Sequence, residues 1–279
     1  MTVINTNTAA TLTANALTKN ERAMSQAMER LSTGVRINSA SDDAAGLAIS
    51  SRMTSQINGL NQAVRNANDA TSMVQTADGA LIEVTNMLQR MREIAVQGAS
   101  GTNTGTNDMA AINTEYEALR DEVFQIVDDT QWNGATLLDG NVVAAGDQTV
   151  DFHVGANASQ KVTIDFGDFE TGSFGTFTAA HNIDAAGEAN TAIGIIDTAL
   201  TTVNSKRAVF GAAINRLEHT ADNLANVSQN TSASRSRILD ADYASETTEL
   251  ARTQIIQQAG TAMLSQANQQ AQSVLALLK

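Results

Sequence analysis

The sequence predicts a mainly α-helical protein: a long antiparallel coiled-coil rod formed by both ends of the chain, with a small β-hairpin-containing segment in the middle. Apolar residues recur in alternating steps of three and four near both ends, which is typical of coiled-coil seams. Proline, which breaks helices, is absent from the 279 residues. Aromatic residues make up only 4%, so small side chains must fill the space between closely packed helices.

The first half of the chain contains three predicted helices. In the first, Leu17, Met24 and Leu31 lie seven residues apart, with Met28 on the adjoining row. After the polar connector 98–108, a third helix follows from Met109 to Ile126. Between the first and the third helix, the longest seam predicts one side of a long second helix. Its positions are Leu60, Ala63, Ala67, Ala70, Val74, Ala77, Leu81, Val84, Leu88, Met91, Ala95 and Gly98.

The middle of the chain alternates between apolar and polar residues instead. The apolar positions are Val150, Phe152 and Val154, then Val162, Ile164 and Phe166. This period of two on either side of loop 155–160 predicts a β-hairpin. Residues 131–140 are rich in turn formers, and residues 167–181 are expected to form a loop or a weak strand.

The last part of the chain returns to helical spacing. One seam, interrupted by polar residues, passes through Ile196, Val203, Phe210, Leu217 and Leu224. The final helix has two apolar rows, one with Ile256, Met263 and Val274, the other with Leu264, Leu275 and Leu278. Two rows on one helix indicate more than one neighbour, which is a first sign of assembly.

These elements predict three parts: an inner domain of terminal helices (1–45 with 236–279), a helical rod (46–140 with 182–235) and a short β-rich segment (141–181) without a large outer domain. Because nothing else buries the seams, we expect the two arms to pair. The hairpin would then lie at one tip of the rod and the termini at the other.

Charge and composition exclude several classes of protein. Seventeen basic and thirty acidic residues give a net charge of −13, which disfavours binding to nucleic acid or anionic membranes. No apolar run reaches the length of a membrane span. The start of the chain lacks the basic and apolar stretches of a secretory signal, which suggests a cytoplasmic protein or export without a cleaved signal.

The sequence offers no chemistry for catalysis, for a metal or for a cofactor. Cysteine is absent, and the three histidines (His153, His181, His219) lack metal-ligand spacing. The paired carboxylates at 42–43, 128–129 and 240–242 are expected at helix starts rather than sharing a proton. Phosphate-loop, dinucleotide and nucleophile motifs are also missing, so we expect no enzymatic activity.

Several motifs nevertheless resemble those of one family. LSTGVRINSASDDAAGLAIS at 31–50 resembles the N-terminal signature of bacterial flagellins, and residues 234–278 resemble their C-terminal signature. LQRMREIAVQ at 88–97 and TQWNGATLLDG at 130–140 are similar to further family motifs. The resemblance covers about residues 1–140 and 190–279, in the family's order.

The resemblance implies a structural subunit that polymerises into the helical filament used for bacterial motility. It implies export through the flagellar type III apparatus, an extracellular location, and cap, junction and chaperone proteins as partners. Terminal helices that order on assembly would join copies of the chain through Leu17, Met24, Met28, Leu31, Ile256, Met263, Leu264, Val274, Leu275 and Leu278. The alternative is a hook-filament junction or adaptor protein, which has similar helical ends.

The resemblance also implies one further expectation, which concerns the innate-immune receptor for flagellin. Gln89, Arg90, Ile94 and Glu115 match receptor contact positions of recognised members, whereas Leu119 replaces an arginine and Ala221 a larger aliphatic residue. The motif at 88–97 therefore has two interpretations, a receptor contact and a contact between neighbouring subunits.

Overall fold

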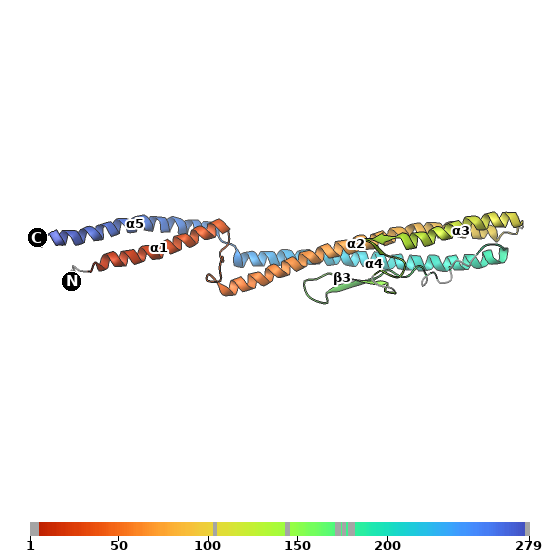
Figure 1. Cartoon of the computed structure of the whole chain (residues 1–279), viewed down its shortest axis with the longest axis horizontal. Helices are drawn as coiled ribbons and strands as arrows, with labels where there is room; N and C mark the ends of the chain where they lie inside the picture. Colours follow the sequence, from red (N-terminus) through yellow and green to blue (C-terminus); the bar gives the residue numbers. More distant parts are fainter. Residues whose placement is uncertain are drawn as a thin grey trace. The chain divides into compact units, whose positions relative to one another are not determined.

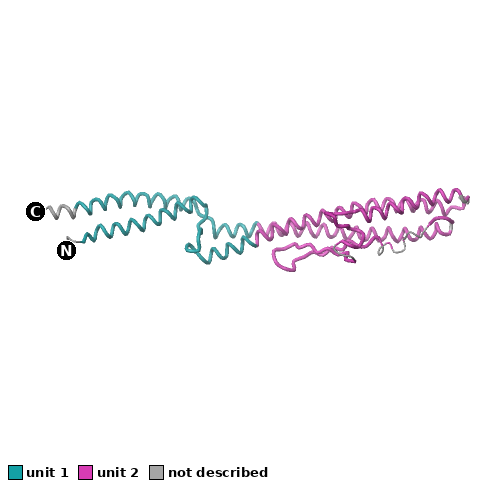
Figure 2. The backbone as a smooth tube through the Cα atoms, viewed as in Figure 1, with its two compact units in different colours: residues 1–55, 229–279 teal, residues 56–228 magenta. Residues whose placement is uncertain are grey.

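The computed structural model describes residues 6–102, 105–142, 146–170, 174, 177 and 182–276. The chain divides into two compact units (Figure 2): the terminal unit, residues 1–55 with 229–279, and the rod unit, residues 56–228. Helices dominate both, and the strands lie in the middle of the sequence, so the predicted fold class is confirmed. The three-part division predicted above stays a prediction.

Long helices build the rod unit. Helices α2 (Ala44–Gly98) and α4 (Ala186–Leu239) continue into the terminal unit, whereas α3 (Thr106–Asp129) belongs to the rod unit alone. Ion pairs join Asp78 to Arg207 at 2.9 Å and Arg92 to Asp197 at 2.7 Å, so α2 and α4 run antiparallel. Figure 1 shows α3 alongside them.

The seam of α2 is buried along its whole length. All twelve positions from Leu60 to Gly98 are buried, and Val74, Leu81, Val84, Leu88 and Met91 are 0% exposed. On α4, Phe210 and Leu217 are also 0% exposed and Leu224 is 8% exposed. After Leu224, the next buried residue of α4 is Ser228. Its hydroxyl donates a hydrogen bond of 2.8 Å to the Asn61 side chain of α2, so a polar pair replaces the apolar row there.

Two short antiparallel strand pairs follow α3. Strands β1 (Gln131–Trp132) and β2 (Ala135–Thr136) enclose an Asn133-Gly134 turn with positive φ at both residues. Strands β3 (Thr149–His153) and β4 (Lys161–Asp165) pair with Phe152 opposite Val162. The hairpin is thus confirmed, whereas the pairing of β1 and β2 was not predicted from their turn-rich sequence.

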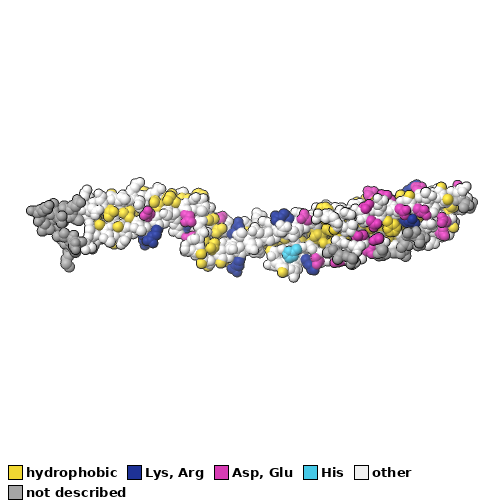
Figure 3. Space-filling model, viewed as in Figure 1, with side chains coloured by type: hydrophobic (Ala, Val, Ile, Leu, Met, Phe, Trp, Pro, Cys, Tyr) yellow, Lys and Arg dark blue, Asp and Glu magenta, His cyan; other side chains and the backbone are white. Residues whose placement is uncertain are grey.

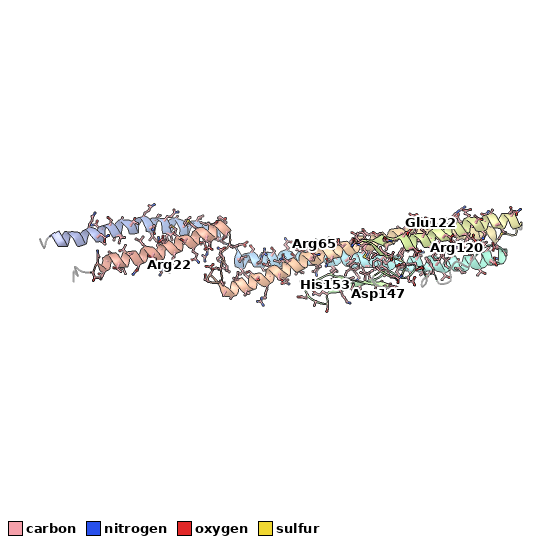
Figure 4. The ribbon with its side chains drawn as sticks, viewed as in Figure 1. Arg22, Arg65, Arg120, Glu122, Asp147 and His153 are labelled. Carbon is pink, nitrogen blue, oxygen red and sulfur yellow. The ribbon has the colours of Figure 1, made fainter. Side chains whose placement is uncertain are left out.

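The expected position of the hairpin at the tip of the rod is wrong. The Asn66 side chain of α2 donates a hydrogen bond of 2.9 Å to the carbonyl oxygen of His153, the hairpin residue labelled in Figure 4, and Ala156 packs near Gly59. These residues lie far along α2 from Gly98, where α2 ends and Ile183 packs. Because α3 runs back along α2 for 24 residues, about 36 Å, it returns the chain to the side of the rod before the hairpin begins.

Phenylalanines fix the central segment to the helices. Phe169 and Phe174 have ring centroids 5.3 Å apart, Phe174 and Phe177 are 5.6 Å apart, and Phe177 lies 6.0 Å from Phe124 of α3. Phe166 of the hairpin lies 5.5 Å from Phe210 of α4. Most of these aromatic residues thus gather where β structure meets helix, and Phe210 of the α4 seam is their contact on that helix.

Candidate assembly surface

The terminal unit is built around a pair of helices, α1 (Thr8–Thr33) and α5 (Tyr243–Ala276). The Asn7 side chain accepts a hydrogen bond from Ala10 and begins α1, and Gly34, at φ 72, ends it. Leu17, Met24 and Leu31 lie half-buried on the side of α1 that faces α5. On α5, Gly260, Leu264 and Ala267 lie half-buried on the facing side.

Polar contacts fix the position of one helix against the other. The buried side-chain amide of Asn20 donates to the carbonyl oxygen of Thr253 at 2.8 Å and to the Gln257 side chain at 3.3 Å. Thr253 is 1% exposed. A buried polar group that loses its partner is costly, so this contact favours one register of the antiparallel pair over its shifted alternatives.

Contacts at both ends agree with that register. The Asn7 side chain donates to the carbonyl oxygen of Ala267 at 3.1 Å. At the other end, Arg30 pairs with Glu246 at 3.1 Å, and the Tyr243 hydroxyl donates to the carbonyl oxygen of Leu31 at 2.9 Å. The pair is therefore held by scattered hydrogen bonds rather than by a continuous apolar core.

The two connections of the terminal unit are joined to each other, and the joining contacts are called the clamp below. Val35, after α1, forms an antiparallel bridge with Asp240, between α4 and α5. The Arg36 N–H donates to the carbonyl oxygen of Leu239 at 2.7 Å, and the Ala241 N–H to that of Gly34 at 3.0 Å. The Arg36 guanidinium adds a bond of 2.7 Å to the carbonyl oxygen of Ile238.

Large apolar side chains of the pair remain in solvent. On α1, Leu12 is 74% and Met28 47% exposed. On α5, Ile255, Ile256 and Met263 are 66%, 41% and 64% exposed. These three side chains and the exposed Ala259 and Ala262 form an apolar surface, here called the outer face of α5. No charged residue occurs between 253 and 278.

The structure separates the predicted assembly residues into groups. Leu17, Met24, Leu31 and Leu264 lie within the helix pair, whereas Met28, Ile256 and Met263 face solvent. The side chains of Val274 and Leu275, and the whole of Leu278, lie outside the described residues. Ile255 and Leu12 were missed because they lie off the heptad rows; the adjacent isoleucines at 255 and 256 were the available signal.

The candidate receptor residues lie on the rod unit. Arg90 pairs with Glu115 of α3 at 2.7 Å. The hydrogen bond to Glu115 makes the largest contribution to a raised pKa of Arg90. Gln89 is exposed, but Ile94 is only 1% exposed. Leu119 and Ala221 pack half-buried against the core. An accessible surface therefore exists at Gln89, Arg90 and Glu115, without Ile94.

Charge is distributed very unevenly between the units. The rod unit holds eight basic and twenty-two acidic residues, a net charge of −14, whereas the terminal unit holds nine basic and eight acidic residues, a net charge of +1. Figure 3 shows acidic side chains gathered over α3 and the adjoining part of α2. The candidate assembly surface thus lies on the unit that is nearly neutral.

Paired carboxylates were expected at helix starts, and Asp43 and Asp242 are there, whereas Asp240 directly follows the last residue of α4. Asp43 accepts a hydrogen bond from the Gly46 N–H at 2.9 Å, and Asp242 accepts one from the Ala244 N–H at 3.0 Å. The expectation is wrong for Asp128 and Asp129, which end α3. Burial, followed by the nearby charges of Asp139 and Asp129, raises the pKa of Asp128.

The described residues contain no group of His, Cys, Asp or Glu side chains placed to hold a metal ion. His153 and His219 are exposed, and His181 lies outside the described residues. Among the described helices, none combines the length and apolar content needed to cross a membrane.

Comparison with known proteins identifies the family at both ends of the chain. The model of the bacterial flagellin N-terminal helical region matches residues 4–143, and that of the C-terminal helical region matches residues 193–278. The flagellin of Halalkalibacterium halodurans is 49% identical over 254 residues, 91% of each chain. The flagellar filament 33 kDa core protein of Treponema phagedenis is 40% identical, over 99% of this chain and 100% of that one.

Solved structures agree. The crystal structure of Bacillus cereus flagellin is similar with a TM-score of 0.51 and 35% identity, over 57% of this chain and 88% of that one. A flagellar hook-associated protein from Vibrio parahaemolyticus has a TM-score of 0.58 over 71% of this chain and 100% of that one, but its 16% identity shows a shared fold alone. The chain belongs to the bacterial flagellin family, whose members are structural filament proteins and not enzymes.

Proposed function

We propose that this filament subunit joins its neighbours through the terminal helices, and that the outer face of α5 is the main contact. The observation that carries this proposal is the exposure of Ile255, Ile256 and Met263 on a helix without charge from residue 253 to 278. Burial of a side chain of this size contributes about 1.5–3 kcal/mol. Small alanines between them allow another helix to approach closely.

The same features support ordering of these helices on assembly. In α1 only Asn20 and Ala27 are buried, and among the described side chains of α5 only Thr253 is. Isolated helices are marginal in water, so this pair needs apolar partners beyond those it contains. A second copy supplies them. Since a head-to-tail contact does not have to close, repetition produces an open helical polymer.

Deletion of residues 240–279 tests the proposal. The deletion removes the whole of α5 and leaves the buried seam of the rod unit intact, so we expect a soluble helical monomer that does not polymerise. Circular dichroism measures helix content, and electron microscopy after seeding detects filaments. Filaments of the truncated chain would contradict the proposal.

A charge on the outer face provides a sharper test than the deletion. Ile256→Glu buries a carboxylate in the proposed contact and should abolish elongation from seeds. Gln254→Glu is the matched control, because Gln254 is exposed on the same helix and lies about 200° of helical rotation away from Ile256. Equal loss in both variants would show that charge anywhere on α5, rather than this face, prevents joining.

Membership of the family supports further proposals about partners and location. We propose export through the flagellar type III apparatus to an extracellular filament, with chaperone, junction and cap proteins as transient partners, and the inner, rod and central parts divided as predicted from the sequence. Binding of the chaperone, junction and cap proteins to the full chain, measured before and after export, tests these proposed partners. The relatives described above are flagellins and filament core proteins, which supports a filament subunit over a junction protein.

The exposed Arg90, Glu115 and Gln89 support a contact with the host receptor for flagellin. The half-buried Leu119 lacks the charge of the matching arginine. Binding of the receptor ectodomain to the monomer tests this contact, and the absence of binding would leave residues 88–97 to subunit contacts.

A further inference from the structure

We propose that Met28 and Met263 form a reversible oxidation site that controls joining: peroxide converts both thioethers to sulfoxides, and the oxidised subunit assembles poorly. This inference rests on the proposed function of the terminal helices. It concerns a chemical modification of that surface rather than its existence.

Exposure selects these two methionines. Met263 is 64% and Met28 47% exposed. Among the other methionines whose side chains the structure describes, Met73, Met91 and Met109 are buried, and Met24, Met53 and Met87 are half-buried. Oxidation of methionine follows exposure, so a dilute oxidant should modify the two assembly residues first.

The surroundings of Met263 make its modification consequential. Met263 lies seven residues after Ile256, on the same side of α5, and the exposed Ala259 and Ala262 lie between them. No charged side chain occurs on this stretch, and the surface offers mainly apolar atoms. A sulfoxide is polar and chiral, and it loses hydrogen bonds to water when a second subunit covers it.

Met28 lies on the other helix of the pair, four residues after the half-buried Met24. The neighbouring buried residue is Ala27, which is 2% exposed and packs toward α5. Met28 therefore extends into solvent from the flank of the pair, with 47% of its area exposed. Its oxidation should leave the pair intact and change only what the pair contacts.

The chemistry needs only a peroxide. A lone pair of the methionine sulfur attacks one peroxide oxygen, the O–O bond breaks, and an S–O bond forms. Sulfur is oxidised by two electrons, and the other peroxide oxygen leaves as water after proton transfer. Methionine sulfoxide reductases reverse the change, one enzyme for each sulfoxide epimer.

The test uses the purified full chain as monomer. The protein is treated with hydrogen peroxide, the peroxide is removed with catalase, and mass spectrometry locates the sulfoxides. The residual monomer concentration after seeded assembly is then measured. We expect oxidation to raise it at least about tenfold, since two apolar contacts become polar, and treatment with both reductases to restore it.

Leucine variants separate the cause from general damage, because Leu and Met have similar volumes. The double variant Met28→Leu and Met263→Leu should assemble normally before and after peroxide. Met24→Leu, on the same helix but facing α5, is the matched control and should remain as sensitive as the natural sequence.

Unchanged assembly of the oxidised natural chain would overturn the inference. So would normal assembly of Met24→Leu alone after peroxide treatment, or loss of assembly by the oxidised double variant. Failure of the untreated chain to assemble would overturn the proposed function itself, and this inference with it.

Discussion

At the scale of single residues, Asp42 shows how one carboxylate organises a connection. Its side chain accepts hydrogen bonds from the backbone N–H groups of Ser39 at 2.9 Å and Asn38 at 3.2 Å, and from Gln26 of α1 at 3.0 Å. The Ser39 backbone bond is the largest contribution to a lowered pKa of Asp42. The ionised form is therefore the one that holds the connection between α1 and α2.

This shift sets the direction of a pH effect. Because the pKa of Asp42 is lower in the folded state, its contribution to stability is present above the unfolded pKa of about 3.9 and is lost as the pH falls through the folded pKa. Asp42→Asn should lower thermal stability at pH of about 6, and the difference from the natural chain should narrow below pH of about 4. Circular dichroism melts across this range measure it.

Glu21→Gln, at an exposed carboxylate of α1, is the control and should change the melting temperature little at any pH. A constant gap between Asp42→Asn and the natural chain from neutral to acidic pH would contradict a role of the ionised carboxylate. Residue-level features of this kind were only partly predictable, because the hydrogen bonds of Asp42 depend on the path of the connection.

At the scale of elements, the seam of α2 was the most predictable feature. All twelve seam positions from Leu60 to Gly98 are buried because a 3.5-residue period keeps one side of a helix facing its partner. The hairpin itself followed equally from alternation. Its place beside α2 did not, because the sequence pattern gives no distance between the return of α3 and the strands.

The seam also supports a quantitative prediction. Leu88→Ala removes a side chain that is 0% exposed, and we expect a loss of about 2–5 kcal/mol in the free energy of unfolding of the rod unit. Ile82→Ala, at a residue of the same helix that is 38% exposed, is the matched control and should cost much less. Urea titrations with unchanged m-values measure both, and equal losses would contradict the buried seam.

The pair of α1 and α5 defines the limit of prediction from periodicity. Two apolar rows on α5 were evident, but their spacing did not reveal which one faces α1. In the structure the facing row includes Thr253 and Gln257, because hydrogen bonds from Asn20 compensate their burial. Ile256 and Met263 are thereby left for other molecules, which a search for the most apolar row cannot anticipate.

At the scale of the whole molecule, the division of charge determines how assembly responds to salt. Net charge was available from composition, but its confinement to the rod unit emerges only when the units are defined. Neighbouring rod units that each hold a net charge of −14 repel one another, and salt screens this repulsion.

We therefore expect seeded elongation to accelerate as sodium chloride rises from about 10 to about 150 mM, as the screening length falls from about 30 to about 8 Å. Turbidity after seeding measures the rate. Potassium chloride at equal ionic strength should act alike if screening is the cause. A decrease in turbidity with added salt would contradict this role of the charge.

The clamp between residues 34–36 and 238–241 has a mechanical consequence. A flagellar filament transmits torque. A single connection between two helices would let one helix rotate relative to the other under that torque. Here the two connections are hydrogen-bonded to each other, so a load on one is shared by both and neither can rotate alone. Stiffness under load thus arises from a few backbone groups of two segments about 200 residues apart in the chain.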